Sequence, residues 1–212
     1  VEMTYGDGSF WNVTLSNQRG NAISGAYVNI GVLGNVYRCL TDDNGTAAFP
    51  INLAPGTYQI NATFEGNSFY ESSFINNTIT VGMGTPVLSA ESLSMFYRDG
   101  SCWNVTLSGE NGDGVSGVYV KIGVLGKVYR CLTDDNGTAS LPINLAPGTY
   151  QINATFDADY RFHSAFINAT LTVNKAILTL TGEDLVMSYR DGSSWNVTLS
   201  GENGDGVSGV YV

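Results

Sequence analysis

The sequence repeats itself with a period of 92 residues. Trp11, Trp103 and Trp195 stand in the same short stretch, which reads SFWNVTLS, SCWNVTLS and SSWNVTLS. Residues 26–64 and 118–156 are identical at 34 of 39 positions. Since tandem near-copies extend a chain and present one surface many times, the repeat favours a structural array over an enzyme.

The repeat predicts three modules joined by short connectors. We expect a first module at 1–82 that lacks its opening strand, a complete module at 83–173 and the opening half of a third at 174–212. Connectors of a few residues predict a semi-rigid string of domains. A half-module cannot bury its apolar face alone, so ordered ends would need outside support. Either the chain is a window on a longer periodic fibre, or subunits donate strands to one another.

Alternation of apolar and polar residues predicts β-strands and no helices. In residues 11–16 (WNVTLS) the tryptophan, valine and leucine are expected to face inward, and Asn12 and Thr14 outward. Turn signals separate the strands, among them DDNG at 42–45, which predicts a hairpin turn with Asx hydrogen bonding. About seven strands in each repeat predict an all-β chain of tandem immunoglobulin-like sandwich modules, arranged as an elongated rod or filament.

Composition and charge narrow the classes of partner. The net charge is −10 and the sequence pI is about 4.3, so no basic stripe is available to bind nucleic acid. No apolar run approaches the roughly 20 residues that span a bilayer, so we expect no membrane insertion within this segment. Cys39 and Cys131 occupy the same repeat position and Cys102 has no repeated partner, so we expect free thiols rather than disulfides.

Several motifs resemble those of known surface proteins. TDDNGTA, PINLAPGTYQINATF and GNSFYESS at 66–73 resemble bacterial immunoglobulin-like repeats of the invasin and large-adhesin type. MSYRDGSSWNVTL, taken with TDDNG and INLAPGTY, resembles more narrowly the repeats of adhesin-like surface proteins of methanogenic archaea. The resemblance implies long, surface-attached, often glycosylated stalks or fibres at the cell exterior. DADYRFHS at 157–164 departs from the pattern by losing the glycine, and so does the cysteine in YRCLT.

Asn-x-Thr sequons recur in every module and predict N-glycosylation sites. Asn12 and Asn61 are expected to point outward, where a glycan has room. The alternative is that Asn and Thr are ordinary solvent-facing residues copied by duplication. The candidate asparagines are Asn12, Asn44, Asn61, Asn76, Asn104, Asn136, Asn153, Asn168 and Asn196.

Acidic turns raise the question of calcium, and no other cofactor is indicated. Residues 42–44, 134–136 and 157–159 carry paired or alternate carboxylates, and calcium at module junctions would stiffen an array. However, DDNG is ordinarily a turn, and nothing supplies the glutamate-ended loop of a dedicated calcium site. We therefore expect turns rather than metal sites.

Catalytic residues are not indicated either. The only histidine, His163, is absent from the first module, and no metal-spaced or nucleophilic set recurs. Tyr5 and its repeats with the tryptophans could form a sugar-binding face, but core packing explains them as well. We expect a structural and adhesive segment whose partners are neighbouring copies, with a cell-surface or polysaccharide ligand as a further candidate. The alternatives are a carbohydrate-binding array or a spacer of a larger extracellular enzyme. Contacts or packing specific to one module are expected where the copies vary, at 17–22 against 109–114 and at 65–73 against 157–165.

Overall fold

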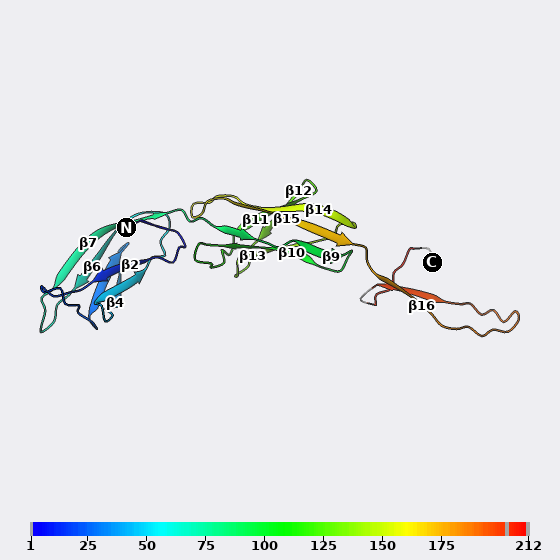
Figure 1. Cartoon of the computed structure of the whole chain (residues 1–212), viewed down its shortest axis with the longest axis horizontal. Coiled ribbons are helices and arrows are strands. Elements are labelled where there is room, and N and C mark those ends of the chain that lie inside the picture. The colour runs from blue at the N-terminus through cyan, green and yellow to red at the C-terminus, as the bar shows by residue number, and fades with distance from the viewer. Residues whose placement is uncertain (1, 202–203, 211–212) are drawn as a thin grey trace.

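The structure, a computed structural model, describes residues 2–201 and 204–210 and consists of strands, turns and loops. Among these residues, no helix is long and apolar enough to cross a membrane. Two sandwiches and a further strand pair follow one another along the long axis of the molecule (Figure 1). Residues 1, 202, 203, 211 and 212 of the expected modules lie outside the described residues, and the module boundaries themselves remain a prediction.

The second sandwich contains two sheets. The larger has the order β12 (Lys127–Leu132), β11 (Tyr119–Val124), β14 (Gly148–Phe156), β15 (Ala165–Asn174) and β9 (Leu93–Phe96). The smaller has the order β13 (Thr138–Pro142), β10 (Cys102–Ser108) and β8 (Val87–Ser89). All neighbours are antiparallel except β9 and β15. The opening segment thus divides its two strands between the sheets, and this strand order is immunoglobulin-like.

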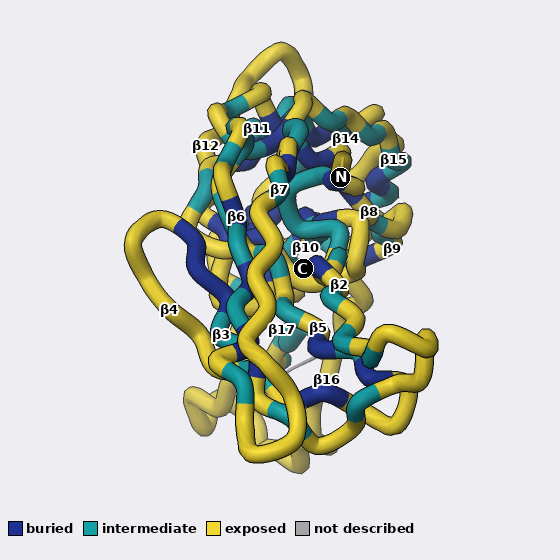
Figure 2. Tube along the Cα trace, turned by 90° about the vertical axis from the view of Figure 1, so that its left-hand side faces the viewer, coloured by how far each residue is buried: buried dark blue, intermediate teal, exposed yellow. Residues whose placement is uncertain are grey.

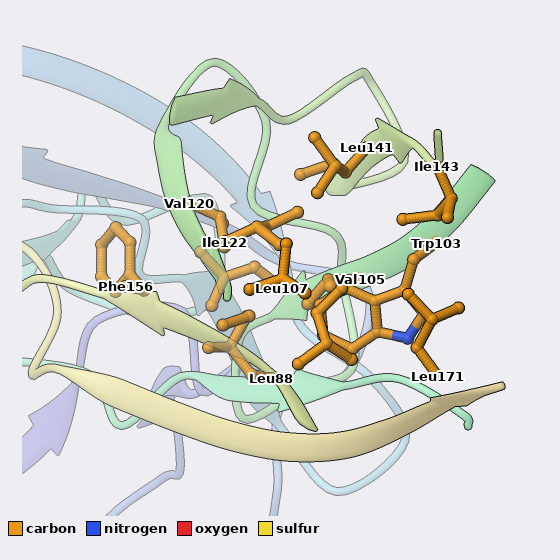
Figure 3. Close-up of a cluster of buried hydrophobic side chains, with 14 of the residues drawn as sticks. Leu88, Trp103, Val105, Leu107, Val120, Ile122, Leu141, Ile143, Phe156 and Leu171 are labelled. Carbon is orange, nitrogen blue, oxygen red and sulfur yellow. The ribbon is translucent and has the colours of Figure 1, made fainter. Parts of the chain in front are cut away.

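Apolar side chains from both sheets meet between them in a single core. Trp103 is its largest buried side chain, and Val105 and Leu107 on the same strand are fully buried. Figure 3 shows Leu88 of β8 beside Leu107, opposite Ile122 of the larger sheet. The alternation read from the sequence therefore identifies the inward face of these strands, and the predicted all-β immunoglobulin-like sandwich is confirmed.

The first sandwich repeats this order with one difference. Its larger sheet runs β1 (Glu2–Thr4), β7 (Ser73–Gly82), β6 (Gly56–Phe64), β3 (Tyr27–Val32) and β4 (Asn35–Leu40). Its smaller sheet contains only β2 (Phe10–Thr14) and β5 (Thr46–Pro50) among the described residues. Buried residues line the inward sides of β3 and β6, whereas the edge strand β4 is almost wholly exposed (Figure 2). No described strand takes the place that β8 has in the second sandwich.

The third segment forms one strand pair, β16 (Leu178–Gly182) with β17 (Val197–Gly201). Within the described residues no second sheet covers this pair. All five residues of β16 are exposed as a result.

The DDNG segment differs from its predicted role. Asp42 accepts the backbone N–H groups of Asn44 and Thr46, so the Asx hydrogen bonds are present. However, the strands on either side, β4 and β5, do not pair and belong to different sheets. The hairpin prediction is wrong, because this turn carries the chain across the sandwich from one sheet edge to the other.

Candidate functional site

The surface with the most specific geometry is the junction between the two sandwiches. Gly84 of the connector donates its N–H to the carbonyl of Arg161 at 2.9 Å, and its own carbonyl accepts the N–H of His163 at 3.0 Å. A Cβ at position 84 would overlap the carbonyl oxygen of Tyr5. The connector is therefore an added strand segment on the loop at 157–163, and only glycine fits at its closest point.

Side chains reinforce this backbone contact. The ring of Phe162, which is buried, meets the ring of Tyr5 edge-on at 5.0 Å. Glu110 of the second sandwich accepts the hydroxyl of Thr4 and the N–H of Thr85, both at 3.0 Å. Both variable segments of the second module, 109–114 and 157–165, thus contact the first sandwich or its connector. The junction is a built interface and not a free hinge.

The loop that holds Phe162 makes the same Asx hydrogen bonds in both sandwiches but carries different side chains, and Gly66 has a positive φ where its counterpart Ala158 does not. Asp159 accepts the N–H groups of Arg161 and Phe162, and Asn67 accepts those of Phe69 and Tyr70 in the same way. Partial burial by itself raises the pKa of Asp159. Hydrogen bonds from the Arg161 and Phe162 backbone, together with the Arg161 guanidinium, outweigh that effect and leave the pKa below its ordinary value. In the second sandwich the loop thus contains an Asp159–Arg161 ion pair, where the first sandwich has the uncharged Asn67 and Phe69.

The predicted sequons lie on strand surfaces and turns. Asn61 and Asn153 are half-buried, and each lies over a glycine of the neighbouring strand, Gly31 or Gly123, where a Cβ would collide with the amide. Asn61 is directly opposite Asn76 in the ladder, and Asn153 is opposite Asn168. The exposed sequon asparagines are Asn12, Asn44, Asn76, Asn104, Asn136, Asn168 and Asn196.

Most of the acidic side chains considered for calcium take part in hydrogen bonds or ion pairs within the protein. Asp134 accepts the N–H groups of Asn136 and Thr138, as its counterpart Asp42 does in the first sandwich. Asp157 forms an ion pair with Lys121, and Asp159 with Arg161. Within residues 2–201 and 204–210 no group of three His, Cys, Asp or Glu side chains is placed to hold a metal ion.

The thiols and the histidine are separate from one another. Cys39, Cys102 and Cys131 are free and half-buried, and burial raises the pKa of the Cys39 and Cys131 thiols. Raised values keep these thiols protonated and weakly nucleophilic. His163 is exposed and takes part in the junction through its backbone N–H.

The aromatic residues divide into core and surface groups. Trp11 and Trp103 are buried in their cores. The exposed rings of Tyr27 and Tyr119 are each covered by a guanidinium, with Arg38 at 3.7 Å and Arg130 at 4.3 Å from the ring centroids. A sugar ring would have to displace these cations to stack on the tyrosines.

Sequence reasoning did not find the ring contact between Tyr5 and Phe162. The only signal was indirect: the DADYRFHS loop departs from its copy, and a departure in a nearly exact repeat marks a position with a particular neighbour.

No protein-family model and no curated protein matches the chain. Among solved structures, the chain is similar to the bacterial integrin-binding protein invasin, with 20% identity over 98% of this chain and 46% of that one, at a TM-score of 0.42. A segment of titin has 14% identity over 97% and 73% of the two chains, at a TM-score of 0.45. A Ca2+-stabilized adhesin of an ice-binding Antarctic bacterium has 16% identity over 84% and 49%, at 0.31. The chain thus spans about half of the invasin and ice-adhesin structures, and the fold assignment rests on the strand order given above.

Proposed function

We propose that this chain is a repeat segment of a long extracellular fibre or stalk, which displays its modules at a cell surface and mediates attachment. The observation that carries the proposal is the built junction, in which Gly84, Glu110 and Phe162 fix one sandwich to the next. A defined junction between near-identical modules makes an extended array with one surface repeated along it. Its main partners are then neighbouring copies of the same module or chain, and its role is structural and not enzymatic.

The strands next to the module ends are arranged to carry tension. β9 pairs in parallel with β15 from Leu93 opposite Leu171 to Phe96 opposite Asn174. β1 pairs in parallel with β7 in the first sandwich. In the second sandwich the chain enters through β8 and then β9 and leaves through β15, so tension between the two ends of the module pulls β9 and β15 in opposite directions. The evenly spaced hydrogen bonds of a parallel pair are then loaded together and not one after another.

The cell-surface setting rests on the motif resemblance and on the sequons. The likeness to repeats of methanogen adhesin-like proteins supports an archaeal surface and a glycosylated filament. Facing asparagines in an antiparallel ladder have Cβ atoms about 5 Å apart, which leaves room for one glycan but not two. We therefore expect at most one occupied asparagine in the pair Asn61 and Asn76, and one in the pair Asn153 and Asn168.

Electron microscopy of source cells with gold-labelled antibody against this chain tests the proposal. Gold along filaments outside the cell is the expected result, and glycopeptide mass spectrometry of the same material locates any glycans. Labelling confined to the cytoplasm would contradict the proposal. Retention of the purified chain on a polysaccharide column, released by that sugar, would favour a carbohydrate-binding array. A catalytic domain in the same polypeptide would favour an enzyme spacer.

A further inference from the structure

The two connectors of the chain begin with the same backbone contact. After the first sandwich, Tyr5 donates its N–H to the carbonyl of Gly82 at 2.9 Å. After the second sandwich, Tyr97 donates its N–H to the carbonyl of Asn174, again at 2.9 Å. Tyr97 and Asn174 stand one repeat of 92 residues after Tyr5 and Gly82. The two connectors therefore leave their sandwiches from equivalent positions.

Two residues later the connectors differ at a position where a single methyl group matters. The first connector has Gly84 there and the second has Ala176. Gly84 is buried, and a Cβ on it would overlap the carbonyl oxygen of Tyr5 and lie 3.0 Å from the ring of Phe162. Ala176 would make the same overlap with the carbonyl of Tyr97, which belongs to the second sandwich itself. The second connector thus cannot pass as close to its sandwich as the first does.

The turn beside each connector differs as well. Gly6 and Arg98 occupy the same turn position, with φ values of 75° and 62°. A Cβ on Gly6 would lie 3.7 Å from the Phe162 ring, so the turn leaves room for this ring to reach Tyr5. At the second connector, the guanidinium of Arg98 lies 5.2 Å from the centroid of the Tyr97 ring. The tyrosine that meets an aromatic ring at the first joint therefore carries a cation at the second.

The contacts that close the first joint depend on this close approach. Gly84 exchanges backbone hydrogen bonds with Arg161 and His163, and Asn111 donates its N–H to the carbonyl of Gly6 at 3.3 Å. Hydrogen bonds weaken steeply when their distance or angle departs from the favourable range. A connector pushed away from the Tyr5 carbonyl by the width of a methyl group would lose the bonds to Arg161 and His163.

We propose that the residue at the third position of each connector decides whether the joint is locked or flexible. Gly84 gives a locked joint between the first and second sandwiches. Ala176 gives a hinge after the second sandwich. A filament of this chain is then stiff at its glycine joints and bends at its alanine joints. This uneven stiffness builds on the proposed fibre role and identifies where such a fibre yields.

A distance measurement across the first joint tests the proposal. Asn35 and Lys127 are exposed and occupy equivalent places on the edge strands of the two sandwiches. Asn35→Cys and Lys127→Cys carry spin labels in the full chain, with the three native cysteines replaced by serine and the fold checked by circular dichroism. Double electron–electron resonance then gives the distribution of distances between the labels. With the native connector we expect one narrow distribution.

Gly84→Ala should open the joint. We expect a distribution at least about twofold broader, because a connector without its junction contacts behaves as a flexible linker. Gly82→Ala is the matched control in the same connector. A Cβ at position 82 would lie 3.7 Å from the nearest atoms of Met3 and Thr4, which is an ordinary contact, so the distribution should stay narrow.

Transplanting the second connector separates the methyl group from the rest of the sequence. Residues 82–86 are replaced by the sequence of residues 174–178, NKAIL, which should give the broad distribution. The same transplant with glycine kept at position 84 should give the narrow one. Circular dichroism of each variant confirms that both sandwiches remain folded, so that broadening reports on the joint.

A narrow distribution for Gly84→Ala, at the native distance or at a new one, overturns the proposal. A broad distribution with the native connector overturns it too, and so does equal broadening of the two transplants. The fibre role is judged separately by gold labelling. Labelled surface filaments would retain that role whichever joint bends, and their absence would remove it while leaving the difference between the joints in place.

Discussion

Trp103 in the second sandwich and Trp195 in the third segment lie in nearly the same sequence but in very different surroundings. Trp103 is 2% exposed and Trp195 is 63% exposed. Both indoles donate to the carbonyl of the residue twelve positions earlier, Glu91 or Glu183. Asp99 and Asp191 also build the same turn, each accepting the N–H of the serine two residues later. Turns, strand register and indole hydrogen bond thus form locally, whereas burial requires an opposing sheet.

The largest expected effect is the difference between these two tryptophans in the stability lost when each is replaced by alanine. Trp103→Ala removes a ring that fills the core between the sheets and should cost about 3–5 kcal/mol in the free energy of unfolding. Trp195→Ala removes an exposed ring and should change it by less than about 0.5 kcal/mol. Urea unfolding followed by circular dichroism measures both. Equal costs would mean that Trp195 is also covered in solution, and the comparison would fail.

Two glycine positions allow the cost of local backbone strain to be compared with the cost of long-range packing. Gly126 has a positive φ of 72°, and no atom lies within 4 Å of the point where an added Cβ would sit. Gly126→Ala should therefore cost only the left-handed strain of about 1–2 kcal/mol. Gly137 has a φ of 76°, but a Cβ there would strike the carbonyl of Leu107 and the backbone around Val115. Gly137→Ala should cost about 1–3 kcal/mol more, because the core strand must move.

Thermal unfolding of both glycine variants provides the measurement. Gly45→Ala serves as a repeat of the Gly137 test, since a Cβ at position 45 would meet the carbonyl of Leu15. If Gly126→Ala and Gly137→Ala lose the same stability, backbone conformation alone decides and the packing contact carries no weight.

Much of the sandwich could be predicted from sequence, because strand alternation is a local pattern. The inward placement of Trp11, Val28 and Ile60 follows from period-two alternation, and all three are buried. The outward placement of Arg38 also follows, although its stacking on Tyr27 does not. Alternation identifies the faces of a strand but not which strand lies beside it.

Long-range pairing is what sequence reasoning missed. The DDNG turn has the same local hydrogen bonds in a hairpin as in a crossing between sheets, so its residues could not distinguish the two. Period-two alternation would place Tyr37 inward, yet it is 42% exposed on the edge strand, with its ring centroid 4.8 Å from that of Phe49. Leu33 has a positive φ of 51°, a conformation that its bulky side chain gives no reason to predict. Each miss depends on a partner strand or a turn type that lies outside the local pattern.

The contact between Tyr5 and Phe162 at the junction should contribute a smaller free energy, comparable to that of a single aromatic pair. Tyr5→Ala and Phe162→Ala should each destabilise the second sandwich, because Phe162 belongs to its core and Tyr5 packs against that core. The double variant should lose less than the sum by about 0.5–1.5 kcal/mol, because the edge-on contact is counted twice in the single variants. Urea unfolding of the four proteins gives this coupling energy. Tyr97 and Phe156 provide a control pair in which neither ring contacts the other, and a coupling near zero is expected.

The smallest effect concerns the charge on the junction loop. Asp159→Asn keeps an oxygen acceptor for the Arg161 and Phe162 N–H groups, as Asn67 shows, but loses the ion pair with Arg161. The expected loss is about 1 kcal/mol or less at neutral pH. Because the folded-state pKa of Asp159 is lowered, its contribution is fully present above the unfolded-state value and disappears as the pH falls through the folded-state value.

Melting temperatures of the wild type and Asp159→Asn should therefore differ most at neutral pH and converge in acid, below about pH 4. Asn67→Asp makes the reverse change in the first sandwich, where Phe69 stands in the place of Arg161. The stability gained there comes from the backbone N–H groups alone. Subtracting this gain from the stability lost in Asp159→Asn therefore isolates the contribution of the arginine. A difference that persists in acid would show that the loop distinguishes the two sandwiches by shape and not by charge.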